Sequence, residues 1–190
     1  MSIMVDEIDR KIIAELQVNG RTPLASIGKK VDRSTVTVWK RLESLLRDKW
    51  IKVQANVNIN KIYSKIAVLD FEARNFNAIN EMMEHFEKCP RVLITYQYGG
   101  TGIVSVLIAE NLSTLESIIA SCSFRDGEGT RRTAIRIGEL PDRDLMLPMQ
   151  IIAKQETTVG PCGCNCTHCM MYQKNRCLGC PVTAHYRGNK

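Results

Sequence analysis

Apolar residues recur at helical spacing through the first fifty positions of the chain. Asp6 can cap a first helix, and Gly20 is a stop signal beyond its end. The apolar face of this helix consists of Ile8, Ile12, Ile13 and Leu16. Thr22 and Pro23 predict the start of a short second helix, because threonine is a good N-cap and proline suits the first helical position. Its inward-facing residues are Leu24, Ile27 and Val31.

A third helix is predicted from residue 34 to about residue 47, and it has an unusual polar face. Ser34 is a favourable N-cap, and Val38, Leu42 and Leu45 form a narrow apolar stripe. The other face carries Thr35, Val36, Thr37, Trp39, Lys40, Ser44 and Arg47. Hydroxyl, cationic and small apolar groups together suit a helix in a DNA major groove, although an ordinary amphipathic helix with a basic face gives a similar pattern. Three short helices with a turn at Asp32 predict a helix-turn-helix domain over residues 1–53.

The periodicity then changes to the alternation that is typical of strands. Residues 51–59 alternate and predict a strand, and we assign residues 54–63 to a linking strand. Strand-like segments follow at 65–72, 92–98, 103–109 and 130–137. Helical segments lie between them at 76–86 and after a cap at Ser113. The order βαββαβ predicts a ferredoxin-like domain over residues 64–150 and places the chain in the α+β class.

The charge of the chain is concentrated towards its two ends. Residues 1–60 carry 11 Lys and Arg against 7 Asp and Glu, residues 61–154 carry 11 against 12, and residues 155–190 carry 4 against 1. A basic N-terminal domain favours an anionic partner such as double-stranded DNA. No apolar run approaches the length that spans a bilayer, and the first residues lack a signal-peptide pattern. We therefore expect a cytoplasmic protein without a membrane partner.

Six of the eight cysteines fall within 19 residues: Cys162, Cys164, Cys166, Cys169, Cys177 and Cys180. In a reducing compartment such a cluster predicts a metal site rather than disulfides. Two residues between thiols allow both to reach one ion, as at Cys166–Cys169 and Cys177–Cys180. We predict a small cysteine-rich module over residues 155–190, with Cys162, Cys166, Cys169, Cys177 and Cys180 as ligands. This pattern resembles small cysteine-rich modules of prokaryotic proteins.

Two metal centres fit this donor set. Zinc suits two Cys-x₂-Cys pairs, called knuckles here, on a module that is too small to fold without a metal ion or another crosslink. A [4Fe–4S] cluster with a redox or oxygen-sensing role fits the same cysteines. Cys164 is left over, and His168 and His185 are spare donors. Cys89 and Cys122 each stand alone among apolar residues and are expected to be buried core thiols.

The motifs together are similar to the Lrp/AsnC (feast/famine) family of transcriptional regulators. The resemblance covers roughly residues 4–150 and is most specific at 6–13, 34–41 and 45–51. It implies a dimer or higher homo-oligomer that binds DNA, with Arg41 at a position that faces the DNA backbone in the family. It also implies that the second domain dimerises through its sheet and binds an amino-acid effector between subunits.

The sequence departs from the family pattern at three turns. Asp32 and Lys49 stand where the family usually has glycine. The family's G-x-x-D loop reads Gly99, Gly100, Thr101 and Gly102 here, so the acidic partner for an effector's ammonium group is absent. These four residues are the candidate effector site, and the alternative is a simple glycine-rich hairpin.

We therefore expect a sequence-specific transcriptional regulator with no catalytic residues. Its DNA-binding residues would be Ser34, Thr35, Val36, Thr37, Trp39, Lys40, Arg41 and Arg47. Two alternatives stay open: an architectural DNA-binding protein, and an enzyme similar to siroheme decarboxylases, which share the two-domain plan. The enzyme needs histidine and arginine aimed at a tetrapyrrole, and Arg131, Arg132 and Arg136 have no histidine near them in sequence.

Overall fold

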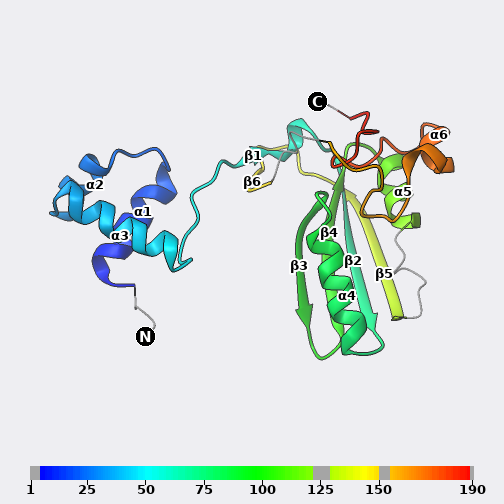
Figure 1. The fold of residues 1–190 in the computed structure, drawn as a ribbon, viewed down its shortest axis with the longest axis horizontal. Coiled ribbons are helices and arrows are strands. Elements are labelled where there is room, and N and C mark those ends of the chain that lie inside the picture. Colours follow the sequence, from blue (N-terminus) through cyan, green and yellow to red (C-terminus); the bar gives the residue numbers. More distant parts are fainter. Residues whose placement is uncertain (1–4, 122–128, 150–154, 189–190) are drawn as a thin grey trace. The chain divides into compact units, whose positions relative to one another are not determined.

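The computed structural model describes residues 5–121, 129–149 and 155–188, and the chain divides into two compact units, Met1–Ala55 and Asn56–Lys190 (Figure 1). The first unit contains α1 (Glu7–Val18), α2 (Leu24–Val31) and α3 (Thr35–Arg47). Its core is formed by the residues that the helical spacing predicts: Ile12, Ile27, Val31 and Val38, flanked by Ile8, Leu16 and Leu24. This agreement follows from the regular spacing, which gives each helix one apolar face.

Side chains cap two of these helices as the sequence predicts. Asp6 accepts from the Asp9 amide in a capping box at α1, and Ser34 accepts from the Thr37 amide at α3. The start of α2 differs from the prediction. Pro23 is itself the N-cap, and the Thr22 hydroxyl donates to the Asn19 carbonyl at 2.7 Å instead of capping the helix. The preceding turn therefore satisfies the hydroxyl, and the helix begins at Leu24 as predicted but without a side-chain cap.

The strand predicted over residues 51–59 is wrong for most of its length. Residues 51–56 have no regular secondary structure, β1 spans only Val57–Asn58, and a 3₁₀ turn, η1 (Ile59–Lys61), follows it. Alternation alone does not make a strand, because a strand needs a hydrogen-bonded neighbour. The only neighbour of β1 in the described residues is β6 (Met146–Leu147), which is equally short.

The second unit contains an antiparallel four-stranded sheet in the order β3-β4-β2-β5. Its elements are β2 (Lys65–Ala73), α4 (Phe76–Glu87), β3 (Val92–Tyr98), β4 (Gly102–Ala109), α5 (Leu112–Ser121) and β5 (Thr130–Glu139). This order confirms the predicted βαββαβ, ferredoxin-like arrangement and the α+β class. One detail differs: the Asn111 side chain, not Ser113, accepts from the first-turn amide of α5.

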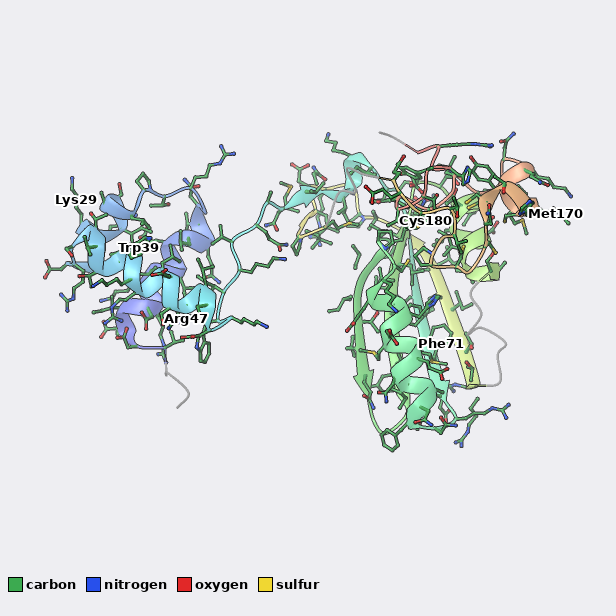
Figure 2. The ribbon with its side chains drawn as sticks, viewed as in Figure 1. Lys29, Trp39, Arg47, Phe71, Met170 and Cys180 are labelled. Carbon is green, nitrogen blue, oxygen red and sulfur yellow. The ribbon has the colours of Figure 1, made fainter. Side chains whose placement is uncertain are left out.

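Both long helices of the second unit cover the same face of the sheet (Figure 1). The core between these layers contains alternate residues of β2 and β4 together with one face of each helix. Its members include Leu69, Phe71, Ile79, Met82, Phe86, Ile103, Leu107, Leu115 and Ile119. Phe71 lies beneath α4 in Figure 2 and stacks on Phe86, with ring centroids 5.7 Å apart. The opposite face is covered at one end, where Ile66 and Ile108 pack in a second core cluster with Ile59 of η1 and Leu147 of β6. The rest of this face, with Ile94, Tyr96 and Tyr98 of β3, is exposed, and we call it the uncovered sheet face.

The cysteine-rich segment belongs to the second unit and is mostly irregular. It contains a 3₁₀ turn, η2 (Cys166–His168), and the one-turn helix α6 (Met170–Gln173). Tyr172 and Tyr186 are buried within it, so the segment packs as part of the unit. Within the described residues, no helix has the length and apolar character needed to cross a membrane.

Candidate nucleic-acid interface and cysteine cluster

One face of α3 points away from the core of the first unit and carries most of the residues predicted to bind DNA. Val38 and Leu45 are buried, whereas Val36 is 62 % exposed and Trp39 is 50 % exposed. Thr35, Lys40 and Arg47 are also exposed, and Trp39 and Arg47 are marked on the helix in Figure 2. An exposed valine and tryptophan on a capped helix form a surface that could contact base edges and thymine methyl groups.

Ser34 and Thr37 are partly committed to the helix start. The Ser34 hydroxyl accepts from the Thr37 amide at 3.1 Å and lies 2.9 Å from the Thr37 hydroxyl. Both side chains keep hydrogen-bonding capacity, because a hydroxyl has one donor and two acceptor sites. They therefore lie at the edge of the exposed face, next to Thr35 and Val36.

Arg41 is placed differently from the sequence-based expectation. Its Nη1 donates to Asp6 at 2.7 Å and to Asp9 at 2.9 Å, and its side chain is half-buried. These contacts hold the pKa of the guanidinium above its ordinary value, with the Asp9 hydrogen bond as the largest cause. In this structure Arg41 joins α3 to the start of α1, so a phosphate contact by Arg41 would have to replace these carboxylates.

Arg47 lies at the end of α3 and is paired at the surface. Its Nε donates to Asp48 at 3.1 Å, and one Nη donates to Ser44 at 2.9 Å. Hydrogen bonds from Arg47 and Ser44 lower the pKa of the Asp48 carboxyl. Because Arg47 is exposed and surface ion pairs are weak, its guanidinium can exchange Asp48 for a phosphate at little cost.

The glycine-rich segment predicted as an effector site forms the turn between β3 and β4. Gly99 has φ +53°, and the Thr101 carbonyl accepts from the Ala73 amide at 2.8 Å. A Cβ on Gly102 would lie 2.5 Å from the Tyr98 ring, so glycine is required for that ring to cover the strand. These contacts describe a tight hairpin, the simpler of the two interpretations.

Seven cysteines line one cavity in the second unit: Cys89, Cys162, Cys164, Cys166, Cys169, Cys177 and Cys180. No disulfide links the cysteines of the described segments. Within those segments, no three His, Cys, Asp or Glu side chains are grouped closely enough to hold a metal ion. The clustering of thiols therefore supports a metal site through its donor chemistry, and preformed coordination geometry does not contribute to that argument.

Burial gives these thiols an unusual environment. It raises the pKa of Cys162 and Cys177, and it raises the pKa of Cys180 to about 12. Burial disfavours the thiolate because a charge loses its hydration in a low-dielectric site. A cation that binds sulfur directly would reverse this balance, since coordination favours deprotonation of the thiol.

Cys89 was expected to be an isolated core thiol, and this expectation is wrong. Cys122, for which the same was expected, lies outside the described residues. Cys89 follows the end of α4 and lies on the wall of the cavity that the six C-terminal cysteines also line. Sequence spacing could not reveal this, because Cys89 is separated from the other cysteines by more than seventy residues. His168 and His185 are not among the residues that line this cavity.

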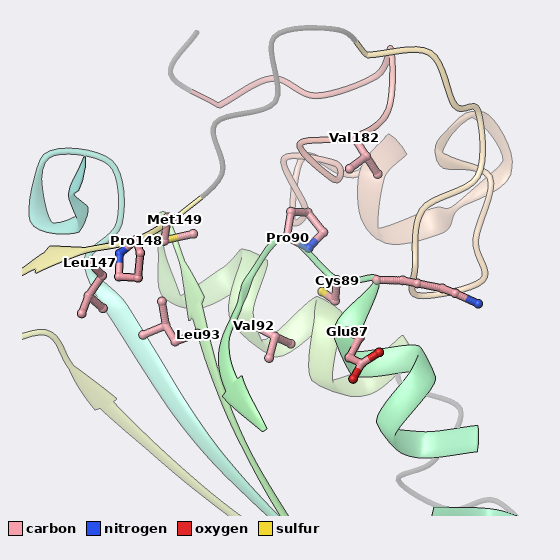
Figure 3. Close-up of a pocket in the computed structure, with 10 residues that line it drawn as sticks. Glu87, Cys89, Pro90, Val92, Leu93, Leu147, Pro148, Met149 and Val182 are labelled. Carbon is pink, nitrogen blue, oxygen red and sulfur yellow. The ribbon is translucent and has the colours of Figure 1, made fainter. Parts of the chain in front are cut away.

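A second cavity of about 320 Å³ lies on the other side of Cys89 (Figure 3). The close-up shows Leu147, Pro148 and Met149 on one wall, with Val182 of the C-terminal segment near Pro90. The lining is mainly apolar, and Glu87 and Lys88 provide its charged groups. Cys89 thus lies between two cavities of the same unit.

Hydroxyl groups on α5 hold the cysteine-rich segment against the sheet domain. Ser113 and Ser117 each donate to the Arg176 carbonyl at 3.0 Å. The Leu178 amide donates to the Thr114 hydroxyl at 3.3 Å, and Thr114 is fully buried. These bonds flank Cys177, so the position of that knuckle is set by the sheet domain.

The uncovered face of the sheet carries apolar and aromatic side chains. On β3, Ile94, Tyr96 and Tyr98 are 55 %, 49 % and 43 % exposed. Register places Val104 and Val106 of β4 beside them. An exposed apolar surface of this kind is characteristic of an association site.

Comparisons with known proteins bear on both units. Residues 5–46 match the model of the AsnC-type helix-turn-helix domain. No curated protein matches the chain. The structure is similar to that of AsnC from Escherichia coli, at 17 % identity and a TM-score of 0.64, over 74 % of this chain and 96 % of that one.

Two further solved structures extend this similarity. A transcriptional regulator from Neisseria meningitidis, in complex with L-methionine, has 16 % identity and a TM-score of 0.63, over 78 % of this chain and 97 % of that one. A transcriptional regulatory protein of the AsnC family from Pyrococcus furiosus has 16 % identity and a TM-score of 0.58, over 73 % of this chain and 93 % of that one. At such identities the similarity establishes the fold. The chain carries an AsnC-type helix-turn-helix domain, and its fold is that of the AsnC/Lrp regulators.

Proposed function

We propose that the protein is a sequence-specific DNA-binding transcriptional regulator of the Lrp/AsnC type. The observation that carries this proposal is the exposed face of α3 within an AsnC-type helix-turn-helix domain. A buried stripe fixes the helix through Val38 and Leu45, and the opposite face presents Val36, Trp39 and Lys40 to solvent. This is the arrangement in which a recognition helix meets the major groove.

The residues of this face have different tasks in the proposed complex. Lys40 and Arg47 bind phosphate and set affinity and register. Thr35, Val36, Thr37 and Trp39 contact base edges and thymine methyl groups and set the choice of site. Arg41 orients α3 through its bonds to Asp6 and Asp9, and so acts on DNA binding indirectly.

Self-association completes the regulator in this proposal. The uncovered sheet face, with Ile94, Tyr96 and Tyr98, is the surface through which two copies associate into a dimer or a higher homo-oligomer. A dimer places two recognition helices on two half-sites, which doubles the DNA contacts. An amino-acid effector bound near Gly99–Gly102 belongs to the same proposal, although the hairpin lacks an acidic partner for an ammonium group.

We propose that the cysteine-rich segment binds a zinc ion or, alternatively, a [4Fe–4S] cluster. Its cysteines are Cys162, Cys166, Cys169, Cys177 and Cys180, and each lines the cysteine cavity. The group would supply a structural crosslink if it is zinc and redox sensitivity if it is a cluster. The thiols of these five cysteines would bind the zinc ion or the cluster.

Site selection from a random duplex library with the full-length protein tests the DNA-binding proposal. We expect enrichment of a roughly palindromic sequence and discrete footprints on genomic fragments that contain it. Val36→Ala and Thr35→Ala should change the enriched sequence, and Glu43→Ala on the same helix is the control. Absence of any enriched sequence, or uniform coverage of DNA in a footprint, would contradict sequence-specific regulation and favour an architectural role.

The enzyme alternative is less well supported by the arrangement of the second unit. Arg131 is paired with Glu72 on the sheet. The described histidines lie on α4 and in the cysteine-rich segment, and not on the strands. A tetrapyrrole site of the siroheme-decarboxylase kind requires histidine beside these arginines, so the regulator is preferred.

A further inference from the structure

We propose that the cysteine cavity is a thiolate metal centre shared between the C-terminal segment and the sheet domain, with Cys89 as a ligand and Arg91 as a hydrogen-bond donor to a ligating sulfur. The inference rests on the proposed metal binding by the C-terminal cysteines. It adds a ligand and a donor from the segment that links α4 to β3, more than seventy residues earlier in the chain.

Cys89 is positioned for this role by the end of α4. The helix ends at Glu87, and the Cys89 amide donates to the Phe86 carbonyl at 3.1 Å. The following proline prevents continuation of the helix. Cys89 and Cys180 line the same cavity. Their two chain segments thus bring one thiol each to a common space.

Arg91 provides a second, independent observation at the cavity. Its side chain is buried, with 1 % of the residue exposed, and it forms an ion pair with the buried Glu110. Its Nη2 donates to the Gly179 carbonyl at 2.8 Å. Its Nε is buried and has no hydrogen-bond partner in the part of the chain that the structure describes. A buried donor without a partner is costly, so its presence calls for an acceptor.

A thiolate sulfur is the acceptor that this cavity offers. Arg91 lines the cavity together with Cys177 and Cys180. It donates to the carbonyl of Gly179, which lies between these two cysteines in the chain. Hydrogen bonds to ligating sulfurs stabilise metal–thiolate centres, and four thiolates on a divalent ion or a [4Fe–4S]²⁺ core leave a net negative charge near the guanidinium. Each ligating thiol releases its proton to solvent as the sulfur–metal bond forms.

The same arginine fixes the knuckle that would hold the metal. Gly179 has φ +82°, and a Cβ there would lie 2.9 Å from the His185 carbonyl oxygen, so only glycine suits the turn between Cys177 and Cys180. Its carbonyl accepts from Arg91, and Glu110 accepts from both Arg91 and the Tyr186 hydroxyl. Metal binding through Cys89 and Cys180 would therefore crosslink the connection between α4 and β3 to the C-terminal segment.

Metal-dependent protection of individual thiols tests this inference on the unmodified full-length protein. The protein is purified anaerobically, loaded with zinc in one arm and with ferrous iron and sulfide in the other, and alkylated with and without a chelator. We expect Cys89 and Cys180 to become reactive together when the metal is removed, at least about tenfold faster than in the loaded protein. Equal alkylation of Cys89 with and without metal would overturn the inference.

Three variants sharpen the result. In the cobalt-substituted protein, Cys89→Ser should lower the sulfur-to-metal charge-transfer intensity, whereas Cys164→Ser, at the cysteine left over by the paired knuckles, should leave it unchanged. Unchanged intensity in Cys89→Ser with the fold intact by circular dichroism would overturn its role as a ligand. Arg91→Lys keeps a cation but loses Nε, and should release metal to a chelator about 10- to 100-fold faster, a cost typical of lost contacts around a metal site.

The zinc and iron loading experiments also distinguish this inference from the proposal that the protein is a DNA-binding regulator. Iron content with a visible absorption band identifies a cluster, and zinc without absorption identifies a closed tetrahedral site. DNA binding is measured on the same samples through tryptophan fluorescence, since both tryptophans of the chain lie in residues 1–55. Protein that binds DNA but takes up neither metal contradicts the metal centre alone, and protein that binds metal but no DNA contradicts the regulator alone.

Discussion

Asp32 and Lys49 hold two turns of the helix-turn-helix unit in left-handed backbone conformations, with φ of 52° and 57°. Asp32 ends α2, and Lys49 follows the C-cap of α3. A side chain in this region meets the following carbonyl, which glycine avoids. These are the two positions at which the Lrp/AsnC pattern has glycine, so the departures seen in the sequence are now located at strained turns.

Lys49→Gly should stabilise the first unit by about 0.5–1 kcal/mol, because relief of the left-handed strain exceeds the added entropy of the unfolded chain. Asp32→Gly should have a smaller effect, since aspartate tolerates this conformation better than lysine. Urea unfolding followed by tryptophan fluorescence measures both changes. Lys52→Gly is the control, because Lys52 lies in the segment without regular structure and has no such strain. Equal gains in all three variants would refute the explanation.

At the scale of elements, the ion pairs of Arg41 join α1 to α3. Asp9 is nearly buried, and Asp6 caps α1 while it accepts from Arg41. The sequence predicted correctly that Arg41 lies on α3. The contacts that Arg41 makes there could not be predicted, because Asp9 and Asp6 are 32 and 35 positions away in the chain. Such pairings arise from the packing of the helices, which residue spacing within one helix does not encode.

Lys40 and Arg41 should therefore respond differently to substitution. Arg41→Ala leaves Asp9 without its cation and should lower the stability of the first unit by roughly 1–3 kcal/mol. Lys40→Ala should leave stability unchanged, weaken binding to all sequences, and lower the salt slope of DNA binding by about one unit. Fluorescence-monitored unfolding and binding at several salt concentrations distinguish the two effects. A stable Arg41→Ala protein with a lower salt slope would restore Arg41 as a phosphate contact.

The capping box also gives the first unit a defined pH dependence. The Asp9 amide and the Arg41 guanidinium lower the pKa of the Asp6 carboxyl below its ordinary value of 3.8. Because the folded-state pKa is depressed, this contribution to stability is present above the unfolded value and is lost as the pH falls through the folded value. Asp6→Asn keeps a capping side chain without the charge. The wild type should unfold at higher urea than Asp6→Asn at neutral pH, and this difference should disappear on acidification; a constant difference would contradict the assignment.

Over the whole molecule, the sequence predicted most of the elements, and tertiary contacts explain what it did not predict. The helices of the first unit and the βαββαβ order follow from local periodicity and turn residues, as at Ser34 and Gly102. The predicted strand over 51–59 failed because none of the strands in the described segments pairs with residues 51–56. The position of Cys89 on the wall of the cysteine cavity and the bond from Arg91 to Gly179 were not predictable. The Arg91–Gly179 contact spans 88 residues and depends on how the C-terminal segment docks.

The uncovered sheet face leads to the last prediction, which concerns assembly. Ile94 is 55 % exposed on β3, and register places it beside Val106 on the same face. Burying this face against a second copy removes apolar area from water and would leave a glutamate side chain at position 94 without hydration. Ile94→Glu should therefore weaken dimerisation at least about tenfold, as expected at the centre of an interface.

Sedimentation equilibrium across a concentration series measures this dissociation constant. Gln97→Glu, an exposed position on the same strand whose register partner is Ile103 on the opposite face, is the matched control and should dimerise normally. Because the proposed dimer places two recognition helices on two half-sites, Ile94→Glu should also lose affinity for a two-half-site duplex while keeping its affinity for a single half-site. A variant that remains dimeric and binds the full site as the wild type does would show that subunits associate through another surface.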